Sequence, residues 1–417
     1  MKLYFDKLKQ FKNKEIIYFF WRIYILASFL NMVGIFYVNS ECQFVLKIVR
    51  YICYGVFVTK IFIDWKDGEK ITLSIIVALA ISLAIAFFAR NRSIIFIIII
   101  LVALRKMDFD KLIDIALKTY FICFLIVVCL AILKVIPNWE FSRGNMPRYA
   151  LGFIYSTDAI GIYLAIILMF LYVKKDKASK IELLVLELIN VFMYSYTNGR
   201  LSFILISAIL FLQFLSKFKF VKNIFYSKLA QKCLELICRT LPIILFLGLH
   251  ILVIMYANNS FIANKVNKII SDRIKLTYQA YRKNDVQLFG TDIKWQGWGA
   301  YGYKEMEEGE EFVYNFVDSS YARLVLDCGI IFSCIVMYAY REVLVRNYEN
   351  RNYWLVFAVL FILGWSFIEQ YIINLGKNMF ILSFIPLLEM GEIKKLSYSN
   401  ISKIANNMKN KKEEKWN

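Results

Sequence analysis

The stretch Tyr120-Phe-Ile-Cys-Phe-Leu-Ile-Val-Val-Cys-Leu-Ala-Ile-Leu133 contains no charged side chain, and it lies inside an apolar run over residues 115–136. A helix needs roughly 20 residues to cross the hydrocarbon core of a bilayer, so such a run is typical of a transmembrane helix. The pattern recurs along the chain and predicts twelve spans, of which 93–104 and 201–215 are short. They cover residues 16–38, 44–63, 71–89, 93–104, 115–136, 150–173, 181–196, 201–215, 241–257, 321–340, 353–373 and 376–390.

The composition excludes a water-soluble globular protein. Of the 417 residues, 59% are hydrophobic and only 4 are proline, which gives more apolar surface than a soluble core of this size can bury. Backbone groups in lipid must be paired internally, and these runs lack the period-two alternation of barrel strands. We therefore predict an all-α fold: a polytopic membrane protein with about 12 transmembrane helices, which form a single integral membrane domain over residues 1–417.

Lysine and arginine are divided unevenly between the connections, and they predict the orientation. Cytoplasmic loops are enriched in these residues. If the N-terminus is cytoplasmic, the inner connections hold most of them, and an even number of spans places the basic tail 391–417 in the cytoplasm too. Anionic lipids of the inner leaflet account for the net charge of +19, so membrane lipids are expected partners and nucleic acid is not.

One long outer connection, residues 258–320, contrasts with the short ones. Apolar residues recur in it at helical spacing from Val266 to Tyr281, which predicts an amphipathic helix on the membrane surface. A glycine-rich and aromatic stretch, residues 288–299, and an acidic turn, residues 305–311, follow. Aromatic rings beside amides and carboxylates suit carbohydrate, although an interfacial aromatic belt is the alternative.

Several basic residues break the orientation rule. Arg rather than Lys occupies the outer ends of the spans, and a guanidinium can grip phosphate bidentately. These residues predict a phosphate-bearing lipid substrate, and snorkelling of interfacial side chains is the alternative. The outer arginines are Arg90, Arg92, Arg143, Arg148 and Arg200.

Four segments carry a resemblance to a known family. They are Arg148-Tyr-Ala-Leu-Gly-Phe153, followed by Asp158 and Gly161; Tyr196-Thr-Asn-Gly-Arg-Leu-Ser202; Leu288-Phe-Gly290 with Ile293 and Trp295; and Tyr314-Asn-Phe-Val-Asp-Ser-Ser-Tyr321, which leads into Leu326-Asp-Cys-Gly-Ile330. Together with Glu369, Asn374 and Asn378, their order over most of the chain resembles the bacterial O-antigen and capsular polysaccharide repeat-unit polymerases, within the O-antigen ligase-like superfamily.

This resemblance implies a glycosyltransferase of the bacterial cytoplasmic membrane that needs neither metal nor cofactor. Such a polymerase joins oligosaccharide repeat units linked to undecaprenyl pyrophosphate at the outer membrane face, beside a flippase and a chain-length regulator of the same pathway. The chain departs from the pattern at Gly199, where a serine is common, and at Asp158, where an asparagine is common. Asp318 replaces the histidine of ligases, which favours a polymerase.

The reaction assigns expected roles to the outer residues. A departing pyrophosphate develops negative charge that arginines can stabilise, and the acceptor hydroxyl must lose a proton. We expect Arg148, Arg200 and Arg273 to serve the first need and Asp318 the second. The expected substrate-binding residues are Arg90, Arg92, Trp295, Ser319, Tyr321, Arg323, Glu369 and Asn378.

Alternatives accompany these expectations. Asp318-Ser-Ser320 could cap the following helix, because such side chains accept bonds from its first amides. Arg323 and Asp327, at i and i+4, are predicted to form a pair. Lys47, Arg50 and Lys60 are predicted to pair between helices, and a proton or ion path is the alternative. For the whole chain, a lipid-linked oligosaccharide flippase, an O-antigen ligase and an assembly scaffold are the other functions considered.

Overall fold

The computed structural model describes residues 14–143, 146–299 and 314–389. The predicted basic tail and the acidic turn 305–311 lie outside the described residues. In chain order the elements are α2 (Lys14–Leu30), α3 (Gly34–Val38), α4 (Ser40–Lys66), α5 (Leu73–Phe88), α6 (Ser93–Ala103), α7 (Phe109–Ile132), β1 (Glu140–Arg143), β2 (Met146–Tyr149), α8 (Ser156–Lys174), η1 (Lys175–Lys177), α9 (Lys180–Thr197), α10 (Arg200–Leu215), α11 (Lys219–Phe225), α12 (Lys228–Ala257), α13 (Phe261–Ile269), α14 (Arg273–Lys283), α16 (Ser320–Glu349), α17 (Tyr353–Ser366) and η2 (Met379–Glu389).

The described chain is almost entirely helical, as predicted. Four helices are long and apolar enough to cross a membrane, or five if the bent pair of α10 and α11 counts as one span. They are Phe109–Ile132, Ser156–Lys177, Lys228–Ala257 and Ser320–Glu349. Shorter apolar helices, α5, α6, α17 and η2, occupy other predicted runs.

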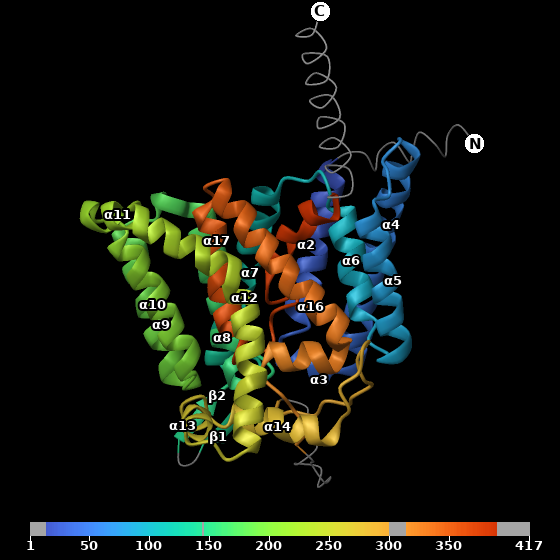
Figure 1. Cartoon of the computed structure of the whole chain (residues 1–417). Coiled ribbons are helices and arrows are strands. Elements are labelled where there is room, and N and C mark those ends of the chain that lie inside the picture. The colour runs from blue at the N-terminus through green and yellow to red at the C-terminus, as the bar shows by residue number, and fades with distance from the viewer. Residues whose placement is uncertain (1–13, 144–145, 300–313, 390–417) are drawn as a thin grey trace, which may run out of the picture.

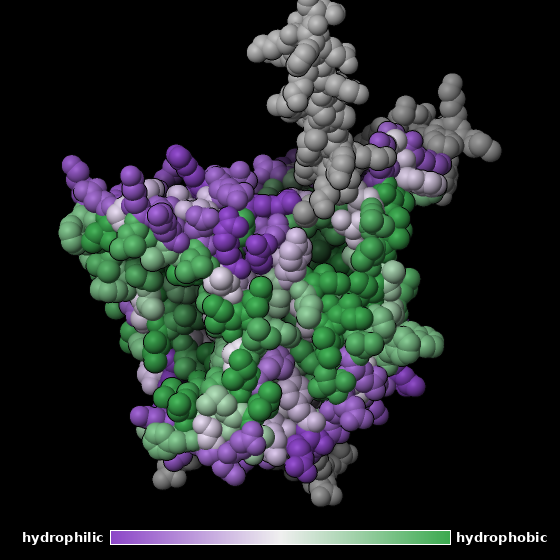
Figure 2. Space-filling view, in the orientation of Figure 1, coloured by the Kyte–Doolittle hydropathy of each residue, from purple (hydrophilic) through white to green (hydrophobic). Residues whose placement is uncertain are grey.

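Helices pack side by side, and the chain turns at two opposite ends of the bundle (Figure 1). One end carries α11, and the other carries the β1–β2 hairpin, α13 and α14. Figure 2 shows an apolar band between two hydrophilic rims at these ends. This distribution is that of a protein with lipid around its middle, because a polar rim is stable only where water or headgroups meet it.

The core of the bundle forms around α8, which is buried over most of its length. It packs against α7, α9, α10 and α17. The Tyr163 hydroxyl donates to the Leu186 carbonyl at 2.7 Å, and this satisfies a polar group that burial would otherwise leave unpaired. α8 is therefore a fixed element of the bundle. Its first turn carries Asp158 and follows the β1–β2 hairpin, which carries Arg148.

The structure differs from the prediction at two places. The single amphipathic helix is two helices, α13 and α14, because Ser271 and Asp272 adopt left-handed φ values of 57° and 63°. The Asn267 side chain holds this turn: its amide donates to Asp272 at 2.7 Å and its oxygen accepts the Lys275 amide at 2.9 Å. The last predicted span, 376–390, is non-helical until Met379 and then forms a 3₁₀ helix that contains Pro386.

A two-stranded hairpin between α7 and α8 was not predicted. β1 and β2 pair in antiparallel register, with Phe141 opposite Arg148. The sequence had placed Arg148 at the outer end of the α8 span, whereas the structure places it in β2. The hairpin therefore positions Arg148.

A break in α16 is filled by a distant segment. Gly329 has φ 85° and ψ 170° inside the helix, so the helical hydrogen bonds around it are lost. The amides of Ile330 and Ile331 donate instead to the carbonyls of Gln287 and Leu288, at 3.2 and 3.3 Å, and the Leu326 carbonyl accepts the Thr291 amide at 2.8 Å. The backbone of residues 287–291 therefore substitutes for a turn of helix.

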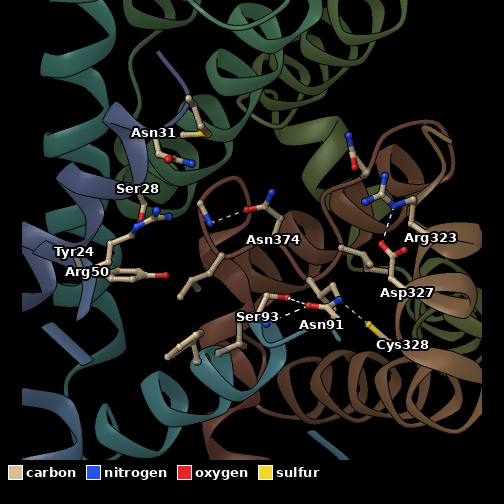
Figure 3. Close-up of a pocket in the computed structure, with 18 of the residues that line it drawn as sticks. Tyr24, Ser28, Asn31, Arg50, Asn91, Ser93, Arg323, Asp327, Cys328 and Asn374 are labelled. Atoms are coloured by element: carbon tan, nitrogen blue, oxygen red, sulfur yellow. Dashed lines mark hydrogen bonds and ion pairs between the residues drawn. The ribbon is translucent and has the colours of Figure 1, made fainter. Parts of the chain in front are cut away.

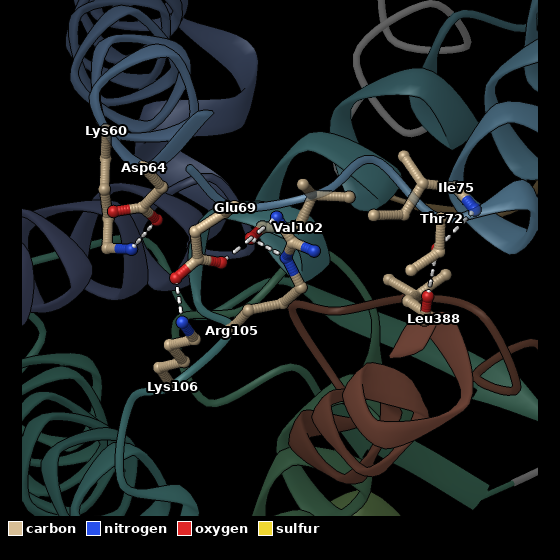
Figure 4. A network of polar contacts seen from close by, with 9 residues as sticks. All are labelled: Lys60, Asp64, Glu69, Thr72, Ile75, Val102, Arg105, Lys106 and Leu388. Atoms are coloured by element: carbon tan, nitrogen blue, oxygen red, sulfur yellow. Dashed lines mark hydrogen bonds and ion pairs between the residues drawn. The ribbon is translucent and has the colours of Figure 1, made fainter. Parts of the chain in front are cut away.

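A polar network connects the helices at the end of the bundle opposite to the hairpin, α13 and α14 (Figure 4). Glu69 forms ion pairs with Arg105 and Lys106, and Arg105 also donates to the Val102 carbonyl at 3.2 Å. The Thr72 hydroxyl donates to the Leu388 carbonyl. These contacts join the α4–α5 loop, the end of α6 and the end of η2. They therefore stabilise the packing of the helices at this end.

Replacing Gly329 tests the break in α16. A Cβ there would lie 2.2 Å from the Leu288 carbonyl oxygen, and its φ is one that L-residues adopt only with strain, which costs about 1–3 kcal/mol. We expect Gly329→Ala to lower the thermal unfolding midpoint of the purified protein by several degrees. Gly248 of α12 is the control, because open space surrounds its Cβ position, and Gly248→Ala should leave the midpoint unchanged or raise it. Equal midpoints for the two variants would contradict the described backbone contact.

Candidate functional site

A cavity of about 840 Å³ lies where the hairpin, α8, α14 and the connection after α17 meet. We name it the Asp318 cavity. It is lined by five of the predicted site residues, from segments far apart in the sequence: Arg148, Arg273, Trp295, Asp318 and Glu369. The sequence predicted these residues singly, and the structure places them around one cavity.

A buried ion cluster forms one wall of the Asp318 cavity. Nε of Arg273 lies 3.3 Å from an Asp318 carboxylate oxygen, and Nη2 lies 2.9 Å from a Glu369 carboxylate oxygen. The Arg273 and Glu369 side chains are 13% and 11% exposed, whereas Asp318 is 24% exposed. Asp318 is therefore the carboxylate of the pair that a molecule in the cavity reaches most readily.

Burial governs the protonation of both carboxylates. It raises the pKa of Asp318, and the nearby charges of Arg273 and Arg323 oppose this rise. It raises the pKa of Glu369 to about 7, again against the charge of Arg273. A carboxyl whose pKa lies near neutrality can exchange a proton with a substrate, which is the property that acid–base catalysis requires.

The first turn of α16 positions this cluster. The Ser320 hydroxyl donates to the Glu369 carbonyl and accepts the amides of Tyr371 and Ile372, at 2.7 and 3.2 Å. Ser320 therefore holds the non-helical connection that carries Glu369 against the first turn of α16. Arg273 begins α14, immediately after the turn held by Asn267.

Helix capping does not explain Asp318. The N-cap residue of α16 is Ser319, and its side chain makes no cap hydrogen bond. Its buried hydroxyl has no partner among the described residues. Asp318 is paired with Arg273 instead, so the capping alternative is wrong and the carboxylate faces the cavity.

Arg148 closes another side of the cavity. Its Nε donates to the Thr197 carbonyl at 2.9 Å, and its guanidinium lies over the Tyr155 ring. Near it, Lys377 donates to Asp158 at 2.5 Å and to the Tyr371 hydroxyl at 2.9 Å. Tyr155, Asp158, Tyr371 and Lys377 were not among the predicted site residues.

Aromatic side chains divide the cavity from its surroundings. The Trp295 indole donates to Asp327 at 2.6 Å, and the Arg323 guanidinium stacks over its ring at 4.3 Å. The predicted Arg323–Asp327 pair is confirmed, at 2.8 Å. Trp298 is 44% exposed, lines the cavity and stacks with Tyr314. Trp298 therefore presents the more accessible ring surface for a sugar. Trp295 instead lies between the cavity and the Arg323–Asp327 pair, and we call this stack the Arg323–Trp295 partition.

The remaining predicted residues line no part of this cavity. Arg92 and Arg200 are exposed at the first turns of α6 and α10. Arg90 is exposed and lies 3.4 Å from Asp292. Tyr321 donates to the Leu363 carbonyl, and Asn378 donates to the Tyr340 hydroxyl and the Ile372 carbonyl, so both stabilise packing.

The charge balance of the cavity suits sugars better than phosphate. Its described lining holds three cations, Arg148, Arg273 and Lys377, and four carboxylates. The carboxylates are Glu140, Asp158, Asp318 and Glu369. Carboxylates, amides and indole rings recognise hydroxyl groups and ring faces, whereas a diphosphate requires an excess of positive charge.

Two other observations bear on chemistry. In the described part of the chain, no group of three or more His, Cys, Asp or Glu residues could hold a metal ion. The single histidine, His250, accepts a bond from the Tyr281 hydroxyl and contacts the Phe246 carbonyl. It is a satisfied packing residue.

Comparisons of the chain with models of protein families, with curated proteins and with solved structures found no match.

Proposed function

We propose that this protein is a polysaccharide polymerase that joins oligosaccharide repeat units carried on undecaprenyl pyrophosphate. The observation that carries the proposal is the Asp318 cavity, where a buried arginine bridges two carboxylates of raised pKa beside accessible aromatic rings. Acid–base groups and a sugar-binding surface in one cavity are what glycosyl transfer needs. The sequence resemblance to repeat-unit polymerases supports the same reaction.

The proposed step is a displacement at the anomeric carbon of the growing chain. The acceptor hydroxyl oxygen forms the new glycosidic bond, and its proton passes to the Asp318 carboxylate. The bond from the anomeric carbon to the diphosphate oxygen breaks, and the electron pair leaves with the lipid diphosphate. Arg273 holds Asp318 in place and links it to Glu369, so the charges of the two carboxyl groups are coupled.

The proposal includes a membrane arrangement. Twelve crossings, with the shorter apolar helices counted as spans, put the Lys-rich end that carries α11 in the cytoplasm. The end that carries the hairpin, α13 and α14 then faces outward. The Asp318 cavity would open on the side where lipid-linked repeat units are polymerised.

Removing the proposed base tests the reaction. Asp318→Asn keeps the shape of the side chain and removes its basicity, so we expect polymer formation to fall by about 10²–10⁴-fold. Polymer length on surface glycan and turnover of lipid-linked repeat units in membranes measure the effect. Asp285→Asn is the matched control, since Asp285 is exposed in the same connection and does not line the cavity. Long polymer from Asp318→Asn would refute the assignment, and repeat units trapped inside a deletion strain would indicate a flippase.

Two charge changes should move the pH dependence in opposite directions. Activity should fall as pH drops, because a base with a raised pKa becomes protonated. The Arg273 charge lowers the pKa of Asp318 and the Asp158 charge raises it. Arg273→Gln should therefore shift the acidic limb to higher pH, and Asp158→Asn should shift it to lower pH. Initial rates of polymerisation from pH 4 to 9 check the signs, and shifts in the same direction would exclude Asp318 as the titrating group.

A further inference from the structure

A second cavity, of about 640 Å³, lies between α2, α4, α6, the first half of α16 and the connection after α17. We name it the Arg50 cavity, and Figure 3 shows its lining. Met32 and Gln370 line both cavities. The two hollows are therefore neighbours that share a wall.

The charge of the Arg50 cavity differs from that of the Asp318 cavity. Its described lining holds three cations, Lys47, Arg50 and Arg323, and one carboxylate, Asp327. Asp327 is already paired with Arg323 at 2.8 Å. Lys47 and Arg50 are left as excess positive charge.

These two cations have no acidic partner among the described residues. The predicted interhelical pairing of Lys47 and Arg50 is wrong: neither lies within ion-pair distance of a described carboxylate, and Lys47 contacts the Tyr51 ring instead. They lie three residues apart on α4 and therefore share one face of that helix. Lys47 is exposed and Arg50 is half-buried. Ionisable groups within a predicted span that face a cavity without an ionic partner are candidates for binding a charged ligand.

The cavity also contains buried polar atoms without partners. Asn31 Oδ1 and Arg323 Nη1 are buried and make no hydrogen bond to the described residues. Both residues line the cavity, as Figure 3 shows. Buried polar groups are nearly always satisfied, so a water molecule or a ligand in the cavity has to donate to Asn31 Oδ1 and accept from Arg323 Nη1.

We propose that the Arg50 cavity binds the phosphate or diphosphate headgroup of a polyprenyl-linked substrate, with Lys47 and Arg50 as its ionic partners. The identification of the lipid rests on the proposed polymerase function. This substrate is the acceptor repeat unit, whose far sugar extends past the Arg323–Trp295 partition and presents its hydroxyl to Asp318 in the Asp318 cavity. Charge and chemistry are thereby divided, with phosphate recognition in one hollow and proton transfer in the other.

The division follows from physical requirements of the two steps. The acceptor's diphosphate stays bound throughout the step, and beside Asp318 and Glu369 it would be repelled by both carboxylates. The donor's diphosphate, by contrast, has to leave that cavity. A headgroup in the Arg50 cavity meets a net positive lining and guanidinium donors. Arg323, stacked on Trp295 with Nη1 unpartnered, can contact the ligand from the partition itself.

Binding to the purified full-length protein tests the proposal without any need for turnover. The probes are polyprenyl phosphate, polyprenol of the same chain length, and inorganic pyrophosphate. We expect polyprenyl phosphate to bind the wild type at least about tenfold more tightly than polyprenol does. Pyrophosphate should compete for the site but bind more weakly, because it lacks the chain. Native mass spectrometry in detergent measures bound lipid and its displacement.

The variant Lys47→Gln/Arg50→Gln should lose this preference, because both ionic partners are removed and no carboxylate is left unpaired. Arg22→Gln/Lys268→Gln is the matched control: it removes one arginine and one lysine that are exposed and line neither cavity, and it should bind as the wild type does. Asn31→Asp, nearly the same in shape, adds a negative charge to the cavity and should also weaken binding of polyprenyl phosphate.

The outcomes separate this proposal from the polymerase proposal. Wild-type binding by both Lys47→Gln/Arg50→Gln and Asn31→Asp would overturn the anion site. Pyrophosphate as tight as polyprenyl phosphate would overturn the lipid as its source. Lost binding in these variants, together with undiminished polymer from Asp318→Asn, would uphold the anion site and reject the polymerase reaction.

Discussion

The contact between the Gln287–Thr291 backbone and the break in α16 is the constraint on which both cavities depend. Gly290 and Gly329 bring two backbones so close that a Cβ on either would clash with the other chain segment. The exchanged hydrogen bonds fix the register between the two segments. Register in turn sets Trp295 against Asp327 and Arg323, and this stack is the wall between the Asp318 and Arg50 cavities.

Charge neutralisation organises the two sides of that wall differently. On one side Arg273 is held by two carboxylates, so its positive charge is largely compensated and the proton affinity of the carboxylates becomes the chemically useful property. On the other side Lys47 and Arg50 keep their charge uncompensated. Since Lys47 is exposed and Arg50 is half-buried, both can accept an anion without first losing a carboxylate partner.

The sequence predicted what depends on local pattern and missed what depends on tertiary pairing. Apolar runs located most of the helices, and spacing identified the Arg323–Asp327 pair. Asp318 was singled out, and its partners Arg273 and Glu369 were both among the predicted residues.

Other features could not be predicted. Ser271 and Asp272 interrupt a helix that the hydrophobic periodicity predicts to be continuous, since left-handed φ values do not alter hydrophobic spacing. The β1–β2 hairpin is too short for strand alternation to reveal. Lys47 and Arg50 were misread because a pattern shows cations but not whether a carboxylate lies across from them.

The Ser320 hydroxyl has a mechanical consequence. It ties the connection that carries Glu369 to the part of α16 that precedes the break at Gly329, and Asp318 directly precedes the same turn. A rotation of this short half-helix about Gly329 would carry Asp318 and Glu369 as one body and preserve the separation between them. The separation of the two carboxylates is therefore set by the Ser320 hydroxyl and does not depend on the flanking connections.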